Sequence, residues 1–240
     1  CGGISRVLFF DEAFSAGSAD VCGNTSRADA AVYNDGLQSG DDDGTGFQGW
    51  TDLIPASNSG FAGFFTGNST TNGDGDGNGD GDINTGGKAW GFYANTGNIA
   101  EATRPFLTPM PDYARLTFRL DNGWLDDPSA AGVVGFSLRN SSNQNLMEFY
   151  FREGDSQYTI NDATDSSPNN SNIPFTDEGL AVEIYLYGSS AYFLSITPLA
   201  GGGPYTFDRT FSNSGSPDRI RFFNFSAGGG DPRNLFVNSL

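Results

Sequence analysis

Apolar residues alternate with polar residues along several short segments, and this alternation constrains the fold more than any other feature of the chain. Segments 116–120 (LTFRL), 147–153 (MEFYFRE) and 182–187 (VEIYLY) each have an apolar residue at their first, third and fifth positions. A period of two residues is that of a β-strand with one buried face. Further segments with strand character are 4–10, 89–94, 133–138, 158–161, 191–197, 219–225 and 235–240.

Turn-forming residues separate these segments, for example DNG at 121–123 and SGSPD at 214–218. A helical pattern is expected at one place, a short turn near 99–103. Many short strands with one apolar face predict an all-β fold, a two-sheet antiparallel β-sandwich of the jelly-roll kind. We expect a single domain over 1–240, in which 1–87 form a loop-rich acidic portion with an N-terminal strand and 88–240 hold the main strands.

The charge balance, the absence of histidine and the length of the apolar runs argue against several classes of protein. The chain has 29 acidic and 12 basic residues, a net charge of −17, which disfavours binding to nucleic acid. It contains no histidine, which excludes Ser-His-Asp and Cys-His catalysis. No apolar run reaches the roughly 18 residues that a transmembrane helix needs.

The segment 71–87 (TNGDGDGNGDGDINTGG) places an oxygen-bearing side chain at nearly every second position. Calcium takes about six to eight oxygen ligands, so this spacing predicts a structural calcium site, with the acidic run 41–43 supplying a further carboxylate. The alternative is a solvated acidic loop. The candidate metal ligands are Asp74, Asp76, Asn78, Asp80, Asp82 and Asn84.

Part of this segment resembles a known calcium loop. The run 76–84 (DGNGDGDIN) resembles the loop of EF-hand and dockerin modules, which implies side-chain ligands from Asp76, Asn78 and Asp80 and a backbone carbonyl ligand from Asp82. The twelfth loop position is Gly87, where the family has a bidentate acid, and the following KAWGFYA reads as a strand. The resemblance therefore implies a calcium loop on a β-sandwich and excludes a helix–loop–helix sensor.

A second resemblance covers residues 84–240. The stretches NTGGKAWGFYA, LDNGW, EFYFREGDSQYTIND and NLFVNSL together resemble jelly-roll modules of large secreted bacterial proteins. This resemblance implies an extracellular β-sandwich.

The cysteines also point outside the cytosol. Cys1 and Cys22 fit one disulfide bond, and the alternative is that Cys1 is the lipid-carrying end of a bacterial lipoprotein. Five sequons for N-glycosylation are present, at Asn24, Asn68, Asn140, Asn169 and Asn224.

No catalytic constellation is evident in the sequence. Glu148 shares its strand face with Tyr150 and Arg152, and Glu183 lies on another strand. The three acidic residues spaced along one strand of laminarinase-like enzymes are missing. We therefore expect the protein not to be an enzyme.

The sequence favours an extracellular structural subunit that forms a homopolymer, such as a filament or surface layer. Lysine commonly protects exposed sheet edges from pairing with other chains, and this chain has a single lysine, Lys88. Both ends of the chain are also apolar and strand-like. Such strands can pair with a neighbouring subunit, although an ordinary edge strand is the alternative for 4–10. The candidate assembly residues are Ile4, Val7, Leu8, Phe9 and Phe10.

The second functional hypothesis is a carbohydrate-binding module with a polysaccharide partner. Such modules stack Trp and Tyr rings on sugar faces and surround them with polar groups. The candidate stacking residues are Trp50, Trp124, Tyr150, Tyr185 and Tyr187.

Overall fold

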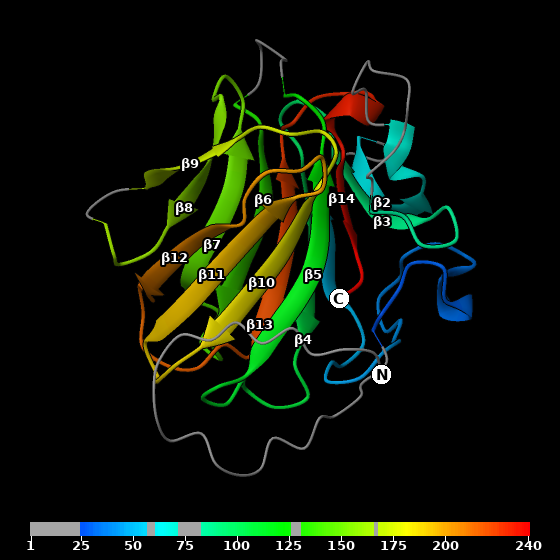
Figure 1. Ribbon diagram of the computed structural model, residues 1–240. Helices are drawn as coiled ribbons and strands as arrows, with labels where there is room; N and C mark the ends of the chain where they lie inside the picture. The colour runs from blue at the N-terminus through cyan, green and yellow to red at the C-terminus, as the bar shows by residue number, and fades with distance from the viewer. Residues whose placement is uncertain (1–24, 57–60, 72–82, 126–130, 166–167) are drawn as a thin grey trace.

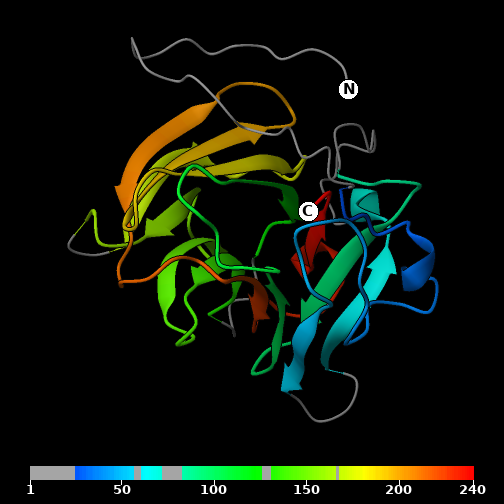
Figure 2. The same ribbon diagram turned by 90° about the horizontal axis from the view of Figure 1, so that it is seen from below.

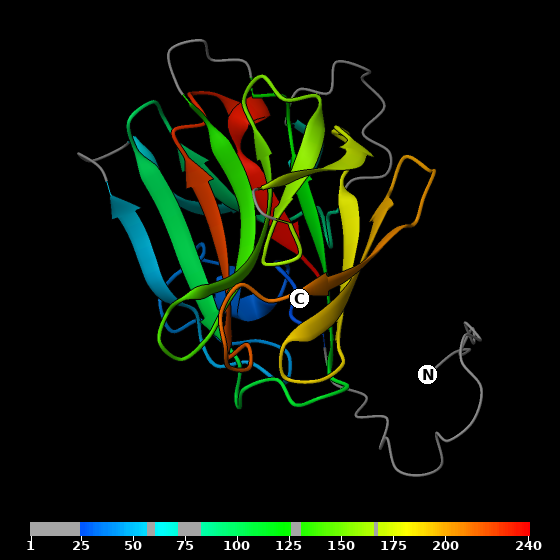
Figure 3. The ribbon, with the colours of Figure 1, turned by 90° about the vertical axis from the view of Figure 1, so that its left-hand side faces the viewer.

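The structure is a computed structural model that describes residues 25–56, 61–71, 83–125, 131–165 and 168–240. It contains two antiparallel sheets of seven strands each, packed face to face as two layers (Figures 1 and 3). The expected all-β, two-sheet sandwich is therefore confirmed. The described helices are short 3-10 turns at Ala31–Tyr33, Ser69–Thr71 and Asp231–Arg233, none of them long enough to cross a membrane.

Sheet I has the strand order β1-β4-β13-β6-β7-β8-β9, and sheet II has the order β12-β11-β10-β5-β14-β3-β2. The strands of sheet I are β1 (Thr51–Ala56), β4 (Ile99–Pro105), β13 (Arg219–Phe225), β6 (Val133–Arg139), β7 (Asn145–Arg152), β8 (Gln157–Asn161) and β9 (Asn169–Pro174). The strands of sheet II are β12 (Tyr205–Thr210), β11 (Ala191–Pro198), β10 (Leu180–Leu186), β5 (Arg115–Asn122), β14 (Leu235–Asn238), β3 (Ala89–Ala94) and β2 (Ala62–Gly67).

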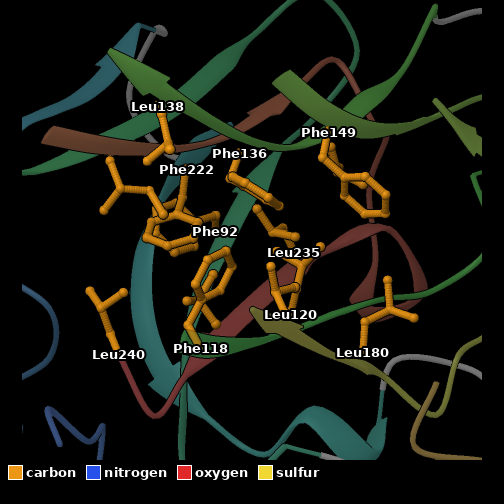
Figure 4. Packing of buried hydrophobic residues seen from close by; sticks show 14 of the residues in the cluster. Phe92, Phe118, Leu120, Phe136, Leu138, Phe149, Leu180, Phe222, Leu235 and Leu240 are labelled. Atoms are coloured by element: carbon orange, nitrogen blue, oxygen red, sulfur yellow. The ribbon is translucent and has the colours of Figure 1, made fainter. Parts of the chain in front are cut away.

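The apolar face of each alternating segment forms the core between the sheets. Figure 4 shows Phe118 and Leu120 of sheet II facing Phe136 and Phe222 of sheet I. The ring of Phe118 meets that of Phe136 edge to face at 4.8 Å between centroids. Edge-to-face contact suits the charge distribution of aromatic rings, so these pairs add directional attraction to the burial of apolar area.

Strand β4 corrects the expectation of a helical turn near 99–103. It is an interior strand of sheet I, paired with β1 and β13. Its residues do alternate, because Ala100, Ala102 and Arg104 all point inward and are fully buried. Small alanines and a charged arginine do not produce a visible apolar stripe, which is why the pattern was missed. Strands β1, β2, β9 and β12 also lie outside the segments selected from the sequence.

Buried Arg104 fixes the acidic segment 26–50 to the sandwich. This segment, blue in Figures 1 and 2, lies beside β2 and β3 at one end of the molecule. The guanidinium donates to five acceptors: the carbonyl of Gln48 (2.7 Å), Ser26 Oγ (3.2 Å), Tyr33 Oη (3.1 Å), Asp42 Oδ1 (3.0 Å) and the carbonyl of Asp43 (2.7 Å). A buried arginine is stable only when its donors are satisfied in this way.

Strand β14 occupies the interior of sheet II. It pairs with β5 on one side and β3 on the other (Figure 1). Its side chains Leu235, Phe236 and Val237 are buried. This apolar strand therefore completes its own sheet, so it is not available to pair with a neighbouring subunit.

Candidate functional site

The register of sheet I brings polar side chains from distant parts of the chain into one row on its outer face. Arg221 on β13 lies opposite Ser137 on β6, Ser137 opposite Glu148 on β7, and Glu148 opposite Asn161 on β8. Cross-strand partners share a face, so these four side chains lie side by side on the surface away from the core. The outer face of sheet I therefore carries a polar and charged row, in which Ser137 and Arg221 are buried and solvent reaches Glu148 and Asn161.

The neighbouring row on the same face adds a carboxylate and two aromatic rings. It runs from Glu101 on β4 through Phe223 on β13 and Gly135 on β6 to Tyr150 on β7. At Gly135 a Cβ atom would lie 2.2 Å from the carbonyl oxygen of Phe149, so only glycine fits there. The two rows together, defined as Glu101, Gly135, Ser137, Glu148, Tyr150, Asn161, Arg221 and Phe223, are called the Arg221 face below.

Arg221 is the centre of this face. Its Nε donates to Ser137 Oγ at 3.0 Å, Nη1 donates to Glu101 Oε2 at 3.2 Å and Nη2 donates to Glu148 Oε1 at 3.3 Å. Its guanidinium carbon also lies 4.6 Å from the ring centroid of Phe223. One arginine side chain, 7% exposed, thus links two carboxylates on different strands.

Two carboxamides hold Glu148 in position. Asn145 Nδ2 donates to Glu148 Oε1 at 2.7 Å, and Asn161 Nδ2 donates to Oε2 at 2.9 Å. Asn145 in turn accepts from Arg139 Nε at 2.7 Å. Both oxygens of Glu148 are therefore oriented by fixed donors, a preorganisation typical of ligand-binding sites.

Burial disfavours the charged form of the arginine at the centre of this face. Burial and the nearby charge of Arg139 lower the pKa of Arg221 to about 10, although Glu101 and Glu148 both act to raise it. Ion pairs of this kind often stabilise a protein no better than apolar residues of the same volume. Perturbed groups held in a fixed arrangement are more frequent at functional sites than elsewhere.

A hollow of about 450 Å³ adjoins the Arg221 face at the end of β7 and β8. Tyr150, Arg152, Asp155 and Thr159 contribute to its lining. Burial raises the pKa of Tyr150, while the charge of Arg152 acts to lower it. The hollow gives an elongated ligand room beside the charged row.

The candidate stacking residues lie in different places. Trp50 is fully buried, with its Nε1 donating to Tyr33 Oη, so no sugar can reach it. Trp124 is 42% exposed, and its ring packs edge-on against Phe175. Tyr150 belongs to the Arg221 face, whereas Tyr185 lies on β10 of sheet II and Tyr187 directly follows that strand, with its hydroxyl donating to Asp208.

Two of the five sequons are inaccessible in the folded chain. Asn224 is fully buried and its Nδ2 donates to the carbonyls of Phe92 and Arg233. Asn140 is 5% exposed and donates to Gln144 and Ser214. A glycan needs its asparagine nitrogen at the surface, so these two positions cannot carry one in this fold. Asn68 is exposed, whereas Asn24 and the side chain of Asn169 lie outside the described residues.

Several other predicted sites fall outside the described residues. These are the metal ligands Asp74, Asp76, Asn78, Asp80 and Asp82, the pair Cys1 and Cys22, and the assembly residues Ile4, Val7, Leu8, Phe9 and Phe10. Asn84 is described, and its side chain binds Ser69 N and Asn68 Oδ1. Within the described ranges, no group of three or more Cys, Asp or Glu side chains is placed to hold a metal ion. The calcium site stays a prediction.

The acidic run 41–43, expected to help hold calcium, has other contacts. Asp41 accepts from Gln38 N, Asp42 from Arg104, and Asp43 from Arg27 N. These carboxylates therefore stabilise the segment 26–50 itself.

Sequence reasoning found part of the Arg221 face and missed the rest. Glu148 and Tyr150 were selected as outward-facing neighbours, but Glu101 and Arg221 were not. A signal was present in 219–225 (RIRFFNF), where two arginines and two phenylalanines share the face opposite Ile220 and Phe222. Two arginines and two phenylalanines on the outer face of one strand are unusual for a face that only contacts solvent, and Phe223 is 2% exposed in the folded chain.

No protein-family model matches the chain, and no curated protein matches it. Solved structures do match in part. The chain is similar to a carbohydrate esterase, vb_24B_21, from Shiga toxin-encoding bacteriophage phi24B, at 14% identity over 80% of this chain and 90% of that one, with a TM-score of 0.46. It is also similar to the Crh5 transglycosylase, at 14% identity over 78% and 86% of the two chains, with a TM-score of 0.42. A third structure, SCP-B of the eqolisin family of peptidases, matches at 14% identity over 53% and 62%, with a TM-score of 0.36.

These comparisons correct the functional prediction made from the sequence. The expectation of a non-enzymatic, self-assembling structural subunit is contradicted, because the matching structures are an esterase, a transglycosylase and peptidases. At TM-scores below 0.5, however, such likenesses assign no activity to this chain.

Proposed function

We propose that the protein binds carbohydrate through the Arg221 face of sheet I. The observation that carries this proposal is the pair of carboxylates, Glu101 and Glu148, both held by the buried guanidinium of Arg221. Sugar hydroxyls both donate and accept hydrogen bonds, so a row of carboxylate, carboxamide and guanidinium groups matches them well. The partly exposed carboxylates of Glu101 and Glu148 are the groups of this row that a sugar can reach.

The ring of Tyr150 gives the proposed site a surface on which a sugar can stack. Tyr150 is half-buried in the row next to Glu148 and also lines the adjoining hollow. A tyrosine ring offers an apolar face to the C–H groups of a sugar and a hydroxyl to its edge. A glycan chain lying along the face would contact Tyr150 at the hollow and the carboxylates beside it.

The test is a glycan array followed by calorimetry on the glycans that bind. We expect Glu148→Gln and Tyr150→Ala each to weaken binding by about tenfold, the size expected for losing one charge-assisted hydrogen bond or one stacked ring. Asp112→Asn is the matched control, because it removes one exposed carboxylate outside the Arg221 face, in the loop before β5 of sheet II. Binding that survives both site variants would contradict the proposal.

A second candidate function, cleavage or transfer of a glycosidic bond, is favoured by the same two carboxylates. Glycoside chemistry uses a pair of carboxyl groups on either side of the scissile bond, one as an acid and one as a base or nucleophile. Glu101 on β4 and Glu148 on β7 each accept from a different terminal nitrogen of the same guanidinium. If the bound glycan is cleaved, Glu101→Gln and Glu148→Gln should each abolish product formation while the Asp112→Asn variant remains active.

A further inference from the structure

A second hollow, of about 340 Å³, lies on the outer face of sheet II, on the other side of the molecule from the Arg221 face. Strands β5, β10 and β11 form its floor, and Figure 1 looks onto this face. Register places Thr117, Glu183 and Ser195 in one row and Arg119, Ala181 and Thr197 in the next. With Arg27 and Arg115 at its margin, this set is called the arginine hollow.

Among the described residues, the arginine hollow is where guanidinium groups without a carboxylate or carbonyl partner gather. Every other described arginine donates to a carboxylate, a carboxamide or a carbonyl group. The guanidinium groups of Arg27 and Arg119 have no such partner among the described residues, and both line this hollow. Arg115 binds Glu183 at 2.7 Å, and Glu183 is the acidic residue of the lining.

This distribution is unexpected for an acidic chain. With 29 acidic residues against 12 basic ones, a partner for each arginine is readily available. Three guanidinium groups against one carboxylate leave an excess of positive charge in one place, where like charges repel one another. An anionic ligand would relieve that repulsion, since guanidinium groups bind carboxylate and sulphate oxygens through paired hydrogen bonds.

The other groups that line the hollow indicate which class of molecule bears the anionic group. Hydroxyls of Thr117, Ser195 and Thr197 face the hollow, and the next row holds Tyr185, whose ring contacts that of Tyr113. Hydroxyl groups beside an aromatic ring suit a sugar. An acidic peptide would bind best by adding a strand at a sheet edge, whereas this hollow lies over β5 and β10, which are paired on both sides.

We propose that the arginine hollow binds the anionic group of an acidic polysaccharide, a uronate carboxylate or a sulphate ester. The anion lies between Arg27 and Arg119, and the sugar hydroxyls contact Thr117 and Ser195. This site is separate from the Arg221 face and does not depend on the function proposed for that face.

The test measures binding of four polymers by affinity electrophoresis at low salt. Polygalacturonate carries carboxylates, dextran sulphate carries sulphate esters, dextran is neutral, and polyglutamate is an acidic peptide. We expect the protein to bind polygalacturonate or dextran sulphate more tightly than dextran and polyglutamate, and the preferred polymer identifies the anion. Added salt should weaken this binding, because exposed charges are screened within about 10 Å at 0.1 M salt.

The variant Arg27→Gln/Arg119→Gln should bind the preferred polymer about tenfold more weakly. The control Lys88→Gln/Arg233→Gln removes the same charge elsewhere and should bind normally. Equal binding by the two double variants, binding of polyglutamate as tight as that of the sugars, or no binding of either acidic polysaccharide would overturn the proposal. Loss of binding in Glu148→Gln would also overturn it, because the anion would then lie at the Arg221 face.

Discussion

The charged network of the Arg221 face predicts that removing one charge is worse than removing three. In Arg221→Met, the carboxylates of Glu101 and Glu148 lose their common partner while about four fifths of each side chain stays buried. A buried charge without a partner lowers the free energy of unfolding by about 3–5 kcal/mol. Because both carboxylates keep some contact with solvent, we expect a loss of about 3 kcal/mol for Arg221→Met.

The triple variant Glu101→Gln/Arg221→Met/Glu148→Gln removes that penalty. A glutamine at 148 has one acceptor oxygen, so one of the two carboxamide donors that now bind Glu148 loses its partner, at about 1 kcal/mol. We therefore expect the triple variant to be about 2 kcal/mol more stable than Arg221→Met and to have lost glycan binding.

Urea denaturation, followed by the fluorescence of buried Trp50 and Trp90, measures the free energy of unfolding of each variant. A triple variant as unstable as Arg221→Met would show that the network supports the fold through its ion pairs. A stable triple variant that still binds glycan would refute the role assigned to this face.

Two further predictions concern pH and calcium. Burial raises the pKa of Tyr158 and Tyr192, so above about pH 10 the folded chain keeps phenolic protons that the unfolded chain loses. Stability should then fall by about 1.4 kcal/mol per pH unit for each tyrosine, and the raised pKa values of Tyr150 and Tyr187 act in the same direction. Arg221 and Arg139, whose pKa values are lowered, offset only part of this fall. A urea midpoint that stays constant from about pH 9 to about pH 11 would contradict this. If the segment 76–84 binds calcium, the ion at about 100 times its dissociation constant should add about 2.7 kcal/mol to the free energy of unfolding. Melting with calcium and with chelator checks this, and identical midpoints would exclude a stabilising ion.

The sequence predicted those strands whose inward residues are large and apolar. Segments 89–94 and 219–225 match β3 and β13 at both ends, because buried Trp90 and Phe92 in the first and buried Ile220 and Phe222 in the second stand two residues apart. Strand β4 was not predicted, because its inward residues are two alanines and Arg104, which form no stripe of large apolar side chains.

The functional face was harder to predict because it depends on strand order. Arg221 and Glu148 are 73 residues apart and meet because β6 alone separates β13 from β7 in sheet I. Alternation assigns each side chain to a face of its own strand, but it does not say which strands are neighbours. Glu148 was therefore predicted to face outward, and its partner was not.

The place of β14 has a consequence for how the chain folds. Strands β3 and β5 flank β14 and do not pair with each other, so sheet II remains in two parts until residues 235–238 enter between them. On a ribosome, the partly made chain would expose two unpaired strand edges until synthesis has passed β14. Contacts between such distant segments slow folding, and open strand edges invite aggregation. Folding intermediates of this protein should therefore depend on chaperones more than those of a sandwich whose sheets close in sequence order.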